Sequence, residues 1–433
     1  MLTMARPDAL RFFVIGFALA WGIALSGGLV SRVSAADRWT SFRGDGTSLT
    51  DAKNLPLNWS NEENVAWSAD LPGYGQSSPV ICAGRVFTTS VQGAMKDTLI
   101  VVATDLATGK QMWQQTFKGT QGVEDNGYVS KAAPTPSVDD KLVYTFFESG
   151  DVIALTHEGK LAWQRSLTKE YGNFQGNHGV GASLAQTPEH VIVLIDHDGP
   201  GYLVALDKAT GKNAWKVDRP RRVSWTSPVV VARGNRHEIL LSSTGIVESY
   251  HASTGKQLWY VEGLKGNTVA APTATKECVI IGGGSPESSM AIRFGGRGDV
   301  ADTQVVWRAE QATTSFGSPL VIGDVAYFVS KPGVVFAVDV ATGKDLWSHR
   351  LPDSCWASPI GADGRAYFFT KGGRTVVIKA GADAGSAKEA TVLAENALAV
   401  EGRVYGVAAV EGAFVIRTGG KLTCVGKAGS RDK

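Results

Sequence analysis

The sequence predicts an all-β fold, a β-propeller of eight four-stranded blades whose last blade is closed by an N-terminal strand. Three observations predict it. A motif ending in tryptophan recurs along the chain, a proline-containing marker recurs ahead of it, and one tryptophan-ending segment near the N-terminus has no blade of its own. Internal repeats of about 40 to 50 residues are typical of propeller blades.

The tryptophan motif recurs with little change. In five copies a Gly-Lys pair is followed by tryptophan four residues after the glycine: Gly109 to Trp113, Gly159 to Trp163, Gly211 to Trp215, Gly255 to Trp259 and Gly343 to Trp347. Two further tryptophans, Trp67 and Trp307, extend the series, and successive members lie 40 to 52 residues apart. This interval is the length of one four-stranded blade.

The residues of the motif suit a tight turn followed by a strand. In Asp105-x-x-Thr108-Gly109-Lys110 the Asp and Thr side chains can hold the backbone of the turn, and the glycine supplies a positive φ. The tryptophan then lies on the next strand, where its ring can be buried between adjacent blades. One four-stranded sheet cannot bury both of its faces alone, whereas blades stacked round an axis can.

A second marker precedes the Gly-Lys turns. It is a small or hydroxyl residue followed by proline: Ser78-Pro79, Thr135-Pro136, Ser227-Pro228, Ala271-Pro272, Ser318-Pro319 and Ser358-Pro359. Residues 182–188 occupy the corresponding place in the third unit, with the proline displaced. Each marker leads into short runs rich in β-branched and aromatic residues, which is the pattern of strand, turn and strand.

Counting these units predicts eight blades. Seven start near residues 77, 133, 183, 226, 271, 317 and 357, and the seventh has Lys371-Gly372-Gly373 in place of Thr-Gly-Lys. The last region has expected strands at Arg403–Ala408, Ala413–Thr418 and Lys421–Val425 but lacks one that ends in tryptophan. The segment Asn64–Trp67 can supply it and remove the final sheet edge. A ring of seven blades is the alternative.

The N-terminus predicts export. Arg6 and Arg11 precede an apolar stretch, and Val33-Ser34-Ala35 then provides a cleavage site of small residues. We therefore expect a signal peptide at residues 1–35, an arm lying across the propeller at 36–63, and the propeller itself at 64–433. The competing interpretation is an uncleaved membrane anchor, because about 20 apolar residues can span a bilayer.

Charge and cysteine content narrow the function classes. Arg6, Arg11 and Arg32 against Asp8 account for the whole formal charge of +2, so the remainder is neutral. A neutral body argues against a nucleic-acid-binding protein. The four cysteines, Cys82, Cys278, Cys355 and Cys424, are widely spaced. We expect at least Cys82 and Cys278 to be buried free thiols, and no spacing suggests a zinc site.

At this point the chain resembles a known family. The unit Asp-x-x-Thr-Gly-Lys-x-x-Trp with a Ser-Pro-Val start is similar to the repeat of PQQ-binding-like, or quinoprotein-like, β-propellers, over nearly all of residues 64–425. The opening Trp39-Thr40-Ser41-Phe42-Arg43-Gly44 resembles that of an exported bacterial subgroup. This subgroup is similar to the propeller component of the outer-membrane-protein assembly machinery. Fold alone does not fix function.

The resemblance also raises an enzyme hypothesis. Quinoprotein dehydrogenases share the eight-bladed fold and resemble one another in a vicinal cysteine pair against the cofactor, a calcium or lanthanide ion held by Glu, Asn and Asp, and an Asp base. No two cysteines are adjacent in this chain. We therefore expect no cofactor, PQQ included, no metal, and no catalytic residues. Asp196-His197-Asp198-Gly199 is interpreted as a polar loop, with cation ligands as the alternative.

Candidate binding residues follow from the expected geometry. Loops from every blade converge on the axial face, and residues just before the proline markers would ring its funnel: Gln76, Lys131, Trp225, Phe316 and Trp356. The aromatic members could stack on a peptide, a sugar ring or a flat cofactor. Alternatively, Trp225 and Trp356 fill the channel as core. His178 lies in a long polar loop and is added as a candidate, with a loop role as the alternative.

These observations favour an exported scaffold over an enzyme. We expect a monomeric propeller, periplasmic or otherwise extracytoplasmic, that binds a protein partner of the cell envelope, without nucleic acid and without a transmembrane segment in the mature chain. Docking would use the axial face or strand addition at a blade edge. The alternatives are a PQQ-dependent or other oxidoreductase that uses the funnel, and a carbohydrate-binding propeller.

Overall fold

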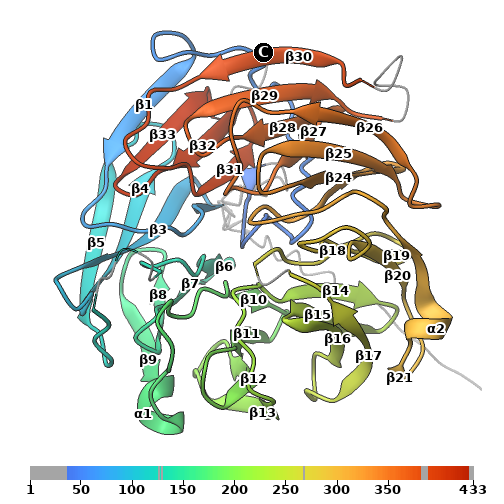
Figure 1. The fold of residues 1–433 in the computed structure, drawn as a ribbon. Helices are drawn as coiled ribbons and strands as arrows, with labels where there is room; N and C mark the ends of the chain where they lie inside the picture. The colour runs from blue at the N-terminus through green and yellow to red at the C-terminus, as the bar shows by residue number, and fades with distance from the viewer. Residues whose placement is uncertain (1–36, 125–126, 128–129, 267–268, 382–388, 429–433) are drawn as a thin grey trace, which may run out of the picture. The chain divides into compact units, whose positions relative to one another are not determined.

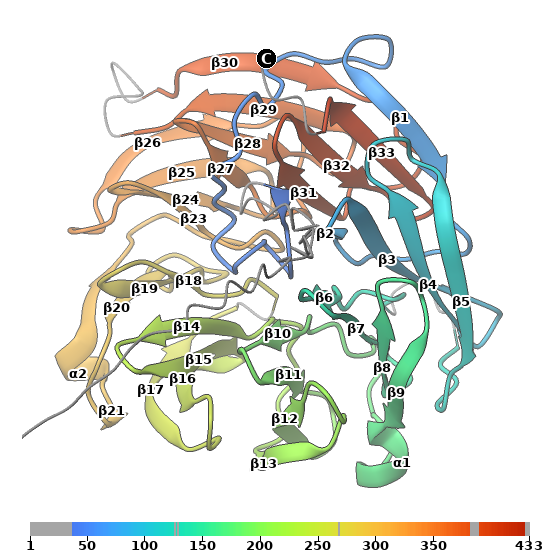
Figure 2. The same ribbon diagram turned by 180° about the vertical axis from the view of Figure 1, so that it is seen from behind.

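The fold is a ring of β-sheet blades. The computed structural model describes residues 37–428 except 125–126, 128–129, 267–268 and 382–388, so the expected signal peptide lies outside the described residues. In the described part the secondary structure is β apart from two short helices, α1 (Leu167–Tyr171) and α2 (Ala301–Gln304). The strands form eight sheets, which Figures 1 and 2 show arranged in a ring. The predicted eight-bladed β-propeller is confirmed.

Blades 1 to 4 follow chain order from the innermost strand outward. Blade 1 comprises β2 (Val80–Cys82), β3 (Arg85–Gln92), β4 (Thr98–Asp105) and β5 (Gln111–Lys118). Blade 2 comprises β6 (Ser137–Val138), β7 (Leu142–Phe146), β8 (Asp151–Thr156) and β9 (Leu161–Ser166). Blade 3 comprises β10 (Ala185–Gln186), β11 (His190–Ile195), β12 (Gly201–Asp207) and β13 (Asn213–Arg219). Blade 4 comprises β14 (Val229–Arg233), β15 (Arg236–Ser243), β16 (Gly245–His251) and β17 (Gln257–Leu264), with β21 (Gly298–Asp299) added in parallel at its edge.

Blades 5 to 8 continue the ring. Blade 5 comprises β18 (Thr273–Ala274), β19 (Cys278–Ile281), β20 (Met290–Arg293) and β22 (Val305–Arg308). Blade 6 comprises β23 (Leu320–Ile322), β24 (Val325–Val329), β25 (Val334–Asp339) and β26 (Asp345–Arg350). Blade 7 comprises β27 (Ile360–Ala362), β28 (Arg365–Phe369), β29 (Arg374–Lys379) and β30 (Val392–Ala397). Blade 8 comprises β31 (Gly406–Val410), β32 (Ala413–Arg417), β33 (Lys421–Gly426) and β1 (Val65–Asp70).

Blade 8 closes the ring as predicted. Its outer strand β1 comes from the N-terminal side of the propeller and pairs antiparallel with β33, so that Trp67 lies opposite Cys424. Two details of the prediction were wrong. The first strand of this blade begins at Gly406 rather than Arg403, because residues 403–405 belong to the incoming loop. The Lys371–Gly373 turn joins β28 to β29 and does not replace the Thr-Gly-Lys turn, whose place falls between β29 and β30.

The hydroxyl residues of the proline marker link neighbouring blades. The backbone N–H of Ser78 donates to Thr135 Oγ1 over 3.0 Å, which satisfies a buried donor immediately ahead of an inner strand. The same link recurs round the ring, and the five donor–acceptor pairs found among the described residues are Ser78 to Thr135, Thr135 to Ser183, Ser183 to Ser227, Ala271 to Ser318, and Ser318 to Ser358. The marker therefore carries the hydrogen bonds that hold the inner ends of the blades together.

The motif tryptophans connect the outer parts of the blades. Trp163 of β9 donates its indole N–H to the carbonyl oxygen of Lys208, in the Gly-Lys turn of the next blade, over 2.8 Å. Equivalent hydrogen bonds of 2.7 to 2.9 Å join Trp67 to Leu106, Trp113 to His157, Trp215 to Ala252 and Trp307 to Val340. The tryptophan and the turn were recognised together in the sequence, and they act together across each blade junction.

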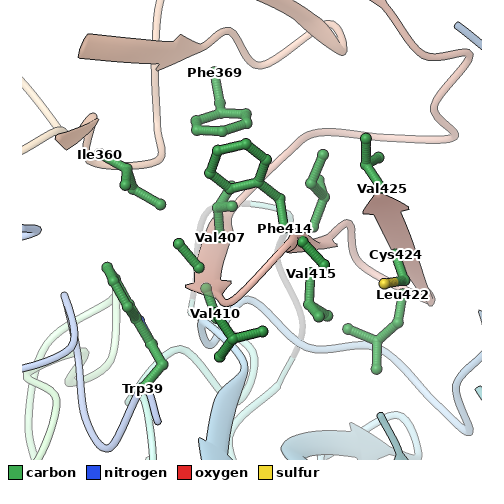
Figure 3. Close-up of a cluster of buried hydrophobic side chains, with 14 of the residues drawn as sticks. Trp39, Ile360, Phe369, Val407, Val410, Phe414, Val415, Leu422, Cys424 and Val425 are labelled. Carbon is green, nitrogen blue, oxygen red and sulfur yellow. The ribbon is translucent and has the colours of Figure 1, made fainter. Parts of the chain in front are cut away.

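The centre of the ring is occupied by residues 39–50. Trp39 exchanges two backbone hydrogen bonds with Ile81 of β2, at 2.9 and 2.7 Å. The N–H of Val138 in β6 donates to the Thr40 carbonyl oxygen, and the N–H of Thr50 donates to that of Gly361 in β27. Figure 3 shows Trp39 in one cluster with Ile360 and with side chains of blade 8. The segment thus contacts inner strands on several sides of the channel.

Arg43 anchors this segment at the axis. Its side chain is 2% exposed, and its guanidinium donates to the carbonyl oxygens of Pro272 and Pro319, both at 2.9 Å, and to Thr273 Oγ1 at 2.6 Å. These acceptors belong to blades 5 and 6, so one side chain bridges two blades. Burial lowers the pKa of Arg43 to about 9, which leaves it charged at neutral pH.

Within the described residues, no helix has both the length and the apolar character needed to cross a membrane.

Candidate functional site

The candidate site is the axial face, which we define by side chains just ahead of the inner strands: Tyr74, Gln76, Lys131, Trp225, Phe316, Trp356, Arg403 and Tyr405. They precede β2, β6, β14, β23, β27 and β31, and therefore come from six different blades. All of them are half-buried except Arg403, which is exposed. The rigid blades fix the points from which these loops start, as is common for binding surfaces carried by loops.

Phe316 and Trp356 form the densest part of this face. Their rings are stacked, with centroids 4.2 Å apart and planes at 15°. The Arg403 guanidinium lies over the Trp356 ring, 4.7 Å from its centroid, and Tyr405 meets the same indole edge-on at 5.7 Å. Both predicted residues are therefore brought together. The alternative, that Trp225 and Trp356 fill the channel as core, stays a prediction.

Tyr405 continues the contact to the next blade. Its hydroxyl and that of Tyr74 lie 2.8 Å apart in a hydrogen bond, and the two rings meet edge-on at 6.2 Å. Burial, followed by this hydrogen bond, raises the pKa of Tyr74, so it is a neutral phenol at any physiological pH. The pair can act as a donor and acceptor of hydrogen bonds but not as an anion.

Gln76 and Lys131 extend the wall by another blade. The Gln76 side-chain oxygen accepts the backbone N–H of Lys131 at 3.0 Å, and the backbone N–H of Gln76 donates to the Lys131 carbonyl oxygen at 2.9 Å. The Lys131 ammonium lies over the Tyr74 ring, 5.3 Å from its centroid. The sequence placed both residues at this face, and the structure also pairs them.

Trp225 and His178 form a second aromatic group. Their rings meet edge-on at 5.7 Å, and the Trp225 indole N–H donates to the Gly179 carbonyl oxygen at 2.9 Å. The backbone N–H of Ser130 donates to the His178 carbonyl oxygen at 3.0 Å, which connects this group to the loop of Lys131. His178 is exposed and is held through its backbone and its ring contact.

A buried arginine lies beneath Tyr74. Arg417 of β32 is fully buried and donates to Ser77 Oγ at 2.7 Å and to the Thr89 carbonyl oxygen at 2.6 Å. Among the described residues, its Nε has no hydrogen-bond partner and no carboxylate forms an ion pair with its guanidinium. Burial lowers the pKa of Arg417 to about 9, so an uncompensated positive charge lies under this part of the face at neutral pH.

The sequence analysis missed Tyr74, Tyr405, Arg403 and Arg417. Tyr74 lies only two residues before Gln76, so its place in the same loop was a signal in the sequence for its position at this face. Tyr405 and Arg403 were assigned to a strand, because blade 8 has no proline marker to define where its inner strand begins. Arg417 could be placed on a strand, but its proximity to Tyr74 depends on packing between blades 8 and 1.

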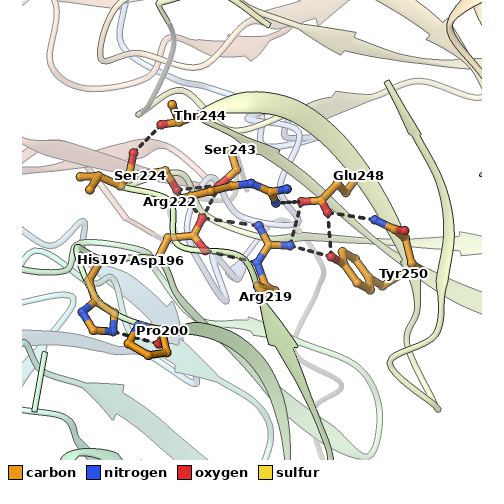
Figure 4. A network of polar contacts seen from close by, with 12 residues as sticks. Asp196, His197, Pro200, Arg219, Arg222, Ser224, Ser243, Thr244, Glu248 and Tyr250 are labelled. Carbon is orange, nitrogen blue, oxygen red and sulfur yellow. Dashed lines mark hydrogen bonds and ion pairs between the residues drawn. The ribbon is translucent and has the colours of Figure 1, made fainter. Parts of the chain in front are cut away.

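A network of buried charges lies between blades 3 and 4 (Figure 4). The Arg219 side chain is 1% exposed and bonds to Asp196 at 3.2 Å and to Glu248 at 2.8 Å. Arg222 also reaches Glu248, at 2.9 Å, and Ser224 donates to Asp196 at 2.7 Å. Two carboxylates thus face two guanidinium groups, and the network is neutral. Its charges and hydrogen bonds are mutually satisfied, so it joins two blades.

The Asp196–Gly199 loop is held by internal contacts. His197 Nδ1 accepts the backbone N–H groups of Gln175, at 2.9 Å, and Gly199, at 3.1 Å, and burial lowers the pKa of His197. Asp198 pairs with Arg221 at 3.0 Å. No group of three or more His, Cys, Asp and Glu side chains that could hold a metal ion occurs among the described residues. The polar-loop interpretation agrees with these contacts.

The cysteines do not fit the quinoprotein site. All four are buried and unpaired, and burial raises the pKa of Cys355 and of Cys424 to about 12. Thiols of this kind are unreactive. A vicinal disulfide against a planar cofactor has no counterpart in these residues, and we derive no step through PQQ. The expectation that the protein uses no cofactor stays a prediction.

Two hollows lie away from the axial face. One, of about 400 Å³, is lined by Trp163, Arg165, Glu170, Tyr171 and Asn213 between blades 2 and 3. The Trp163 ring packs against Gly211, so this face of the indole cannot stack on a sugar. The other, of about 390 Å³, is formed around residues 38–51. Neither contains a residue that the sequence analysis placed in the funnel.

Comparisons with known proteins agree with the fold. The sequence profile of the family described as outer membrane protein assembly factor BamB matches residues 20–184, 174–300 and 296–431. The chain is 26% identical over 235 residues to outer membrane protein assembly factor BamB of Moranella endobia, covering 52% of each chain, so it spans about half the length of this relative.

Two further proteins, one similar in structure and one similar in sequence, are a BamB and a quinone alcohol dehydrogenase subunit. The crystal structure of BamB from Moraxella catarrhalis superimposes with a TM-score of 0.61 at 16% identity, covering 85% of this chain and 99% of that one, which shows a shared fold. The dehydrogenase subunit of an alcohol dehydrogenase (quinone) from Gluconobacter oxydans is 28% identical over 191 residues, 41% of this chain and 24% of that protein. With its profile matched along nearly the whole propeller, the chain belongs to the outer membrane protein assembly factor BamB family.

Proposed function

We propose that this protein is a non-catalytic scaffold of the cell envelope that binds a protein partner during assembly of outer membrane proteins. The observation that carries the proposal is the family match, which extends from residue 20 to residue 431 and so includes every blade. The relative from Moranella endobia is named as an assembly factor of the same kind. On this proposal the protein is exported, acts as a monomer in the periplasm, and needs no cofactor.

The axial face supports a binding role. Its aromatic and cationic side chains come from six blades, and ring contacts or hydrogen bonds join most of them to a neighbour. Half-buried aromatic residues on a rigid scaffold are typical of protein-binding surfaces. Burial keeps Tyr74 protonated, so this side chain offers a neutral hydrogen-bonding group to a partner.

The proposed role in assembly can be tested by deleting the gene in the organism that encodes the protein. The chromosomal gene is deleted, and the β-barrel proteins of the outer membrane are quantified by mass spectrometry of isolated membranes. We expect their levels to fall and to recover when the full chain is supplied. Unchanged levels in the deletion strain would overturn the proposal. Fractionation of the complemented strain checks the expected extracytoplasmic location.

The second candidate function is a PQQ-dependent oxidoreductase, and the partial match to the quinone alcohol dehydrogenase subunit favours it. Calorimetric titration of the purified protein with PQQ, with and without calcium, tests it directly. We expect no saturable heat in a sample shown by circular dichroism to be folded. One-to-one binding would favour the enzyme and would require assays with electron acceptors.

A further inference from the structure

The Arg403 guanidinium is positioned by Trp356 and is exposed, which suits it to bind an anion. The stacking over Trp356 restricts the side chain, while the residue remains exposed. None of the described residues forms an ion pair with it, and the acidic residue closest to Trp356 in sequence, Asp353, is paired with Lys371 at 3.1 Å. A guanidinium offers five N–H donors in a planar fork that matches a carboxylate. Stacking leaves the edge of that fork available.

The neighbouring tyrosines add a neutral donor. Tyr74 and Tyr405 together carry two hydroxyl protons, and the hydrogen bond between them uses one. The second hydroxyl proton has no acceptor among the described residues. Both tyrosine side chains are half-buried at the axial face. A Cβ placed on Gly402, the residue before Arg403, would lie 3.8 Å from the Tyr74 hydroxyl oxygen. The Arg403 backbone and the spare hydroxyl are therefore close in space.

The buried positive charge of Arg417 also favours a negatively charged ligand. It lies beneath Tyr74 without a carboxylate partner, in a region where low dielectric weakens screening. A buried cation that is satisfied only by neutral acceptors leaves a positive potential at the surface above it. Arg403 and Arg417 thus act on one area of the face, over blades 7, 8 and 1.

We propose that this part of the axial face binds an acidic peptide segment of a protein partner, with a carboxylate held by the Arg403 fork and by the spare hydroxyl of the Tyr74–Tyr405 pair. This inference rests on the proposed scaffold function and names the chemistry of its partner. The contacts continue past Tyr74 to Gln76 and Lys131 and, through Ser130, to Trp225. A surface of this extent suits an extended chain with apolar residues between its acidic ones.

The test uses fluorescence anisotropy of the full chain with a labelled short peptide of alternating aspartate and leucine, acetylated and amidated so that only side chains are charged. A peptide with asparagine at every aspartate is its control. We expect saturable binding of the acidic peptide, at least about ten-fold weaker binding of the asparagine peptide, and weakening by salt. Equal binding of the two peptides would overturn the inference, as would displacement by succinate at the same concentration as by unlabelled peptide.

Variants locate the contact. Arg403→Ala should weaken binding of the acidic peptide about ten-fold or more, and Arg403→Lys should recover only part, because an ammonium cannot bind a carboxylate as a fork. The matched control is Arg233→Ala, since Arg233 also stacks on an aromatic ring, Phe294, at 4.0 Å. It should bind like the wild type. Equal affinities of the Arg403→Ala and Arg233→Ala variants would remove Arg403 from the site.

The tyrosine pair is tested separately. The double variant Tyr74→Phe/Tyr405→Phe keeps both rings and should weaken binding several-fold by removing the spare hydroxyl. Unchanged affinity would contradict its role. The peptide experiment is also independent of the proposed function: if deletion of the gene lowers outer membrane proteins but Arg403→Ala restores them fully and binds the peptide normally, the scaffold stands and only this inference fails.

Discussion

The indole of Trp163 lies directly against Gly211 of the next blade: a Cβ placed on Gly211 would fall 2.6 Å from a ring carbon of that indole. Four other blade junctions repeat this contact, with Gly109 on Trp67, Gly159 on Trp113, Gly255 on Trp215 and Gly343 on Trp307. The glycine thus has two roles, a positive φ for the turn and an absent side chain for the tryptophan.

The two remaining motif tryptophans, Trp259 and Trp347, face blades in which the Gly-Lys turn is missing. The indole nitrogens of Trp259 and Trp347 have no hydrogen-bond partner among the residues that the structure describes. They face blades 5 and 7, neither of which has a Gly-Lys pair between its third and fourth strands. In blade 5 that connection carries α2 instead, and β21 within it pairs with the strand of Trp259. In blade 5, where this connection replaces the turn, the Trp259 indole N–H has no acceptor among the described residues.

The first prediction concerns Gly211. Gly211→Ala should destabilise the protein by about 2–4 kcal/mol, because it combines a strained positive φ with a clash against Trp163. The control is Gly234→Ala, at φ +60° with no atom within 4 Å of its added Cβ. It should cost only about 1 kcal/mol, from backbone strain alone. Urea denaturation measures both variants, and equal losses would contradict a steric role for the tryptophan contact.

The repeat could be predicted from the sequence alone, but the contacts between side chains of different blades could not. The blade number, the closure by residues 64–67 and the surface position of Phe316 and Trp356 follow from local pattern, because turns and strands are short-range features. Arg403 and Arg417 could not be found in this way. Their roles depend on loops and strands of different blades that meet near Tyr74. They also depend on there being no carboxylate of the described residues paired with either arginine, and a repeat pattern in the sequence contains no information about such contacts.

The second prediction concerns the centre of the ring. Arg43→Met should destabilise the protein by about 2 kcal/mol or more, because it leaves the buried carbonyl oxygen of Pro272 without its donor and removes one of the two donors to that of Pro319. Arg43→Lys should not restore stability, since one ammonium cannot serve the same set of acceptors. Arg85→Ala, which removes a partly exposed pair with Glu158, is the control and should change stability by under about 1 kcal/mol. Wild-type stability of Arg43→Met would mean that the Arg43 contacts do not hold blades 5 and 6 together.

The third prediction compares two aspartates of one loop. Asp196→Ala should cost about 3–5 kcal/mol, because it leaves the buried Arg219 with one carboxylate instead of two and removes the acceptor that the hydroxyls of Ser224 and Ser243 share. Asp198→Ala removes a partly exposed pair with Arg221 and should cost under about 1 kcal/mol. Thermal unfolding distinguishes the two variants. Similar losses would indicate that the loop matters through its backbone rather than through the buried network.

The last prediction concerns pH. Burial lowers the pKa of His197 below its unfolded value of 6.5, so the unfolded chain binds a proton more tightly than the folded one. Stability from this group is therefore complete above pH ~6.5 and is lost as pH falls through the folded pKa. His197→Asn keeps an acceptor for the N–H groups of Gln175 and Gly199 without titrating. Urea denaturation between pH ~8 and ~5 should show a steeper loss for the wild type than for the variant, because protonation of Nδ1 removes both hydrogen bonds. Parallel loss in the two proteins would assign the pH dependence to other groups.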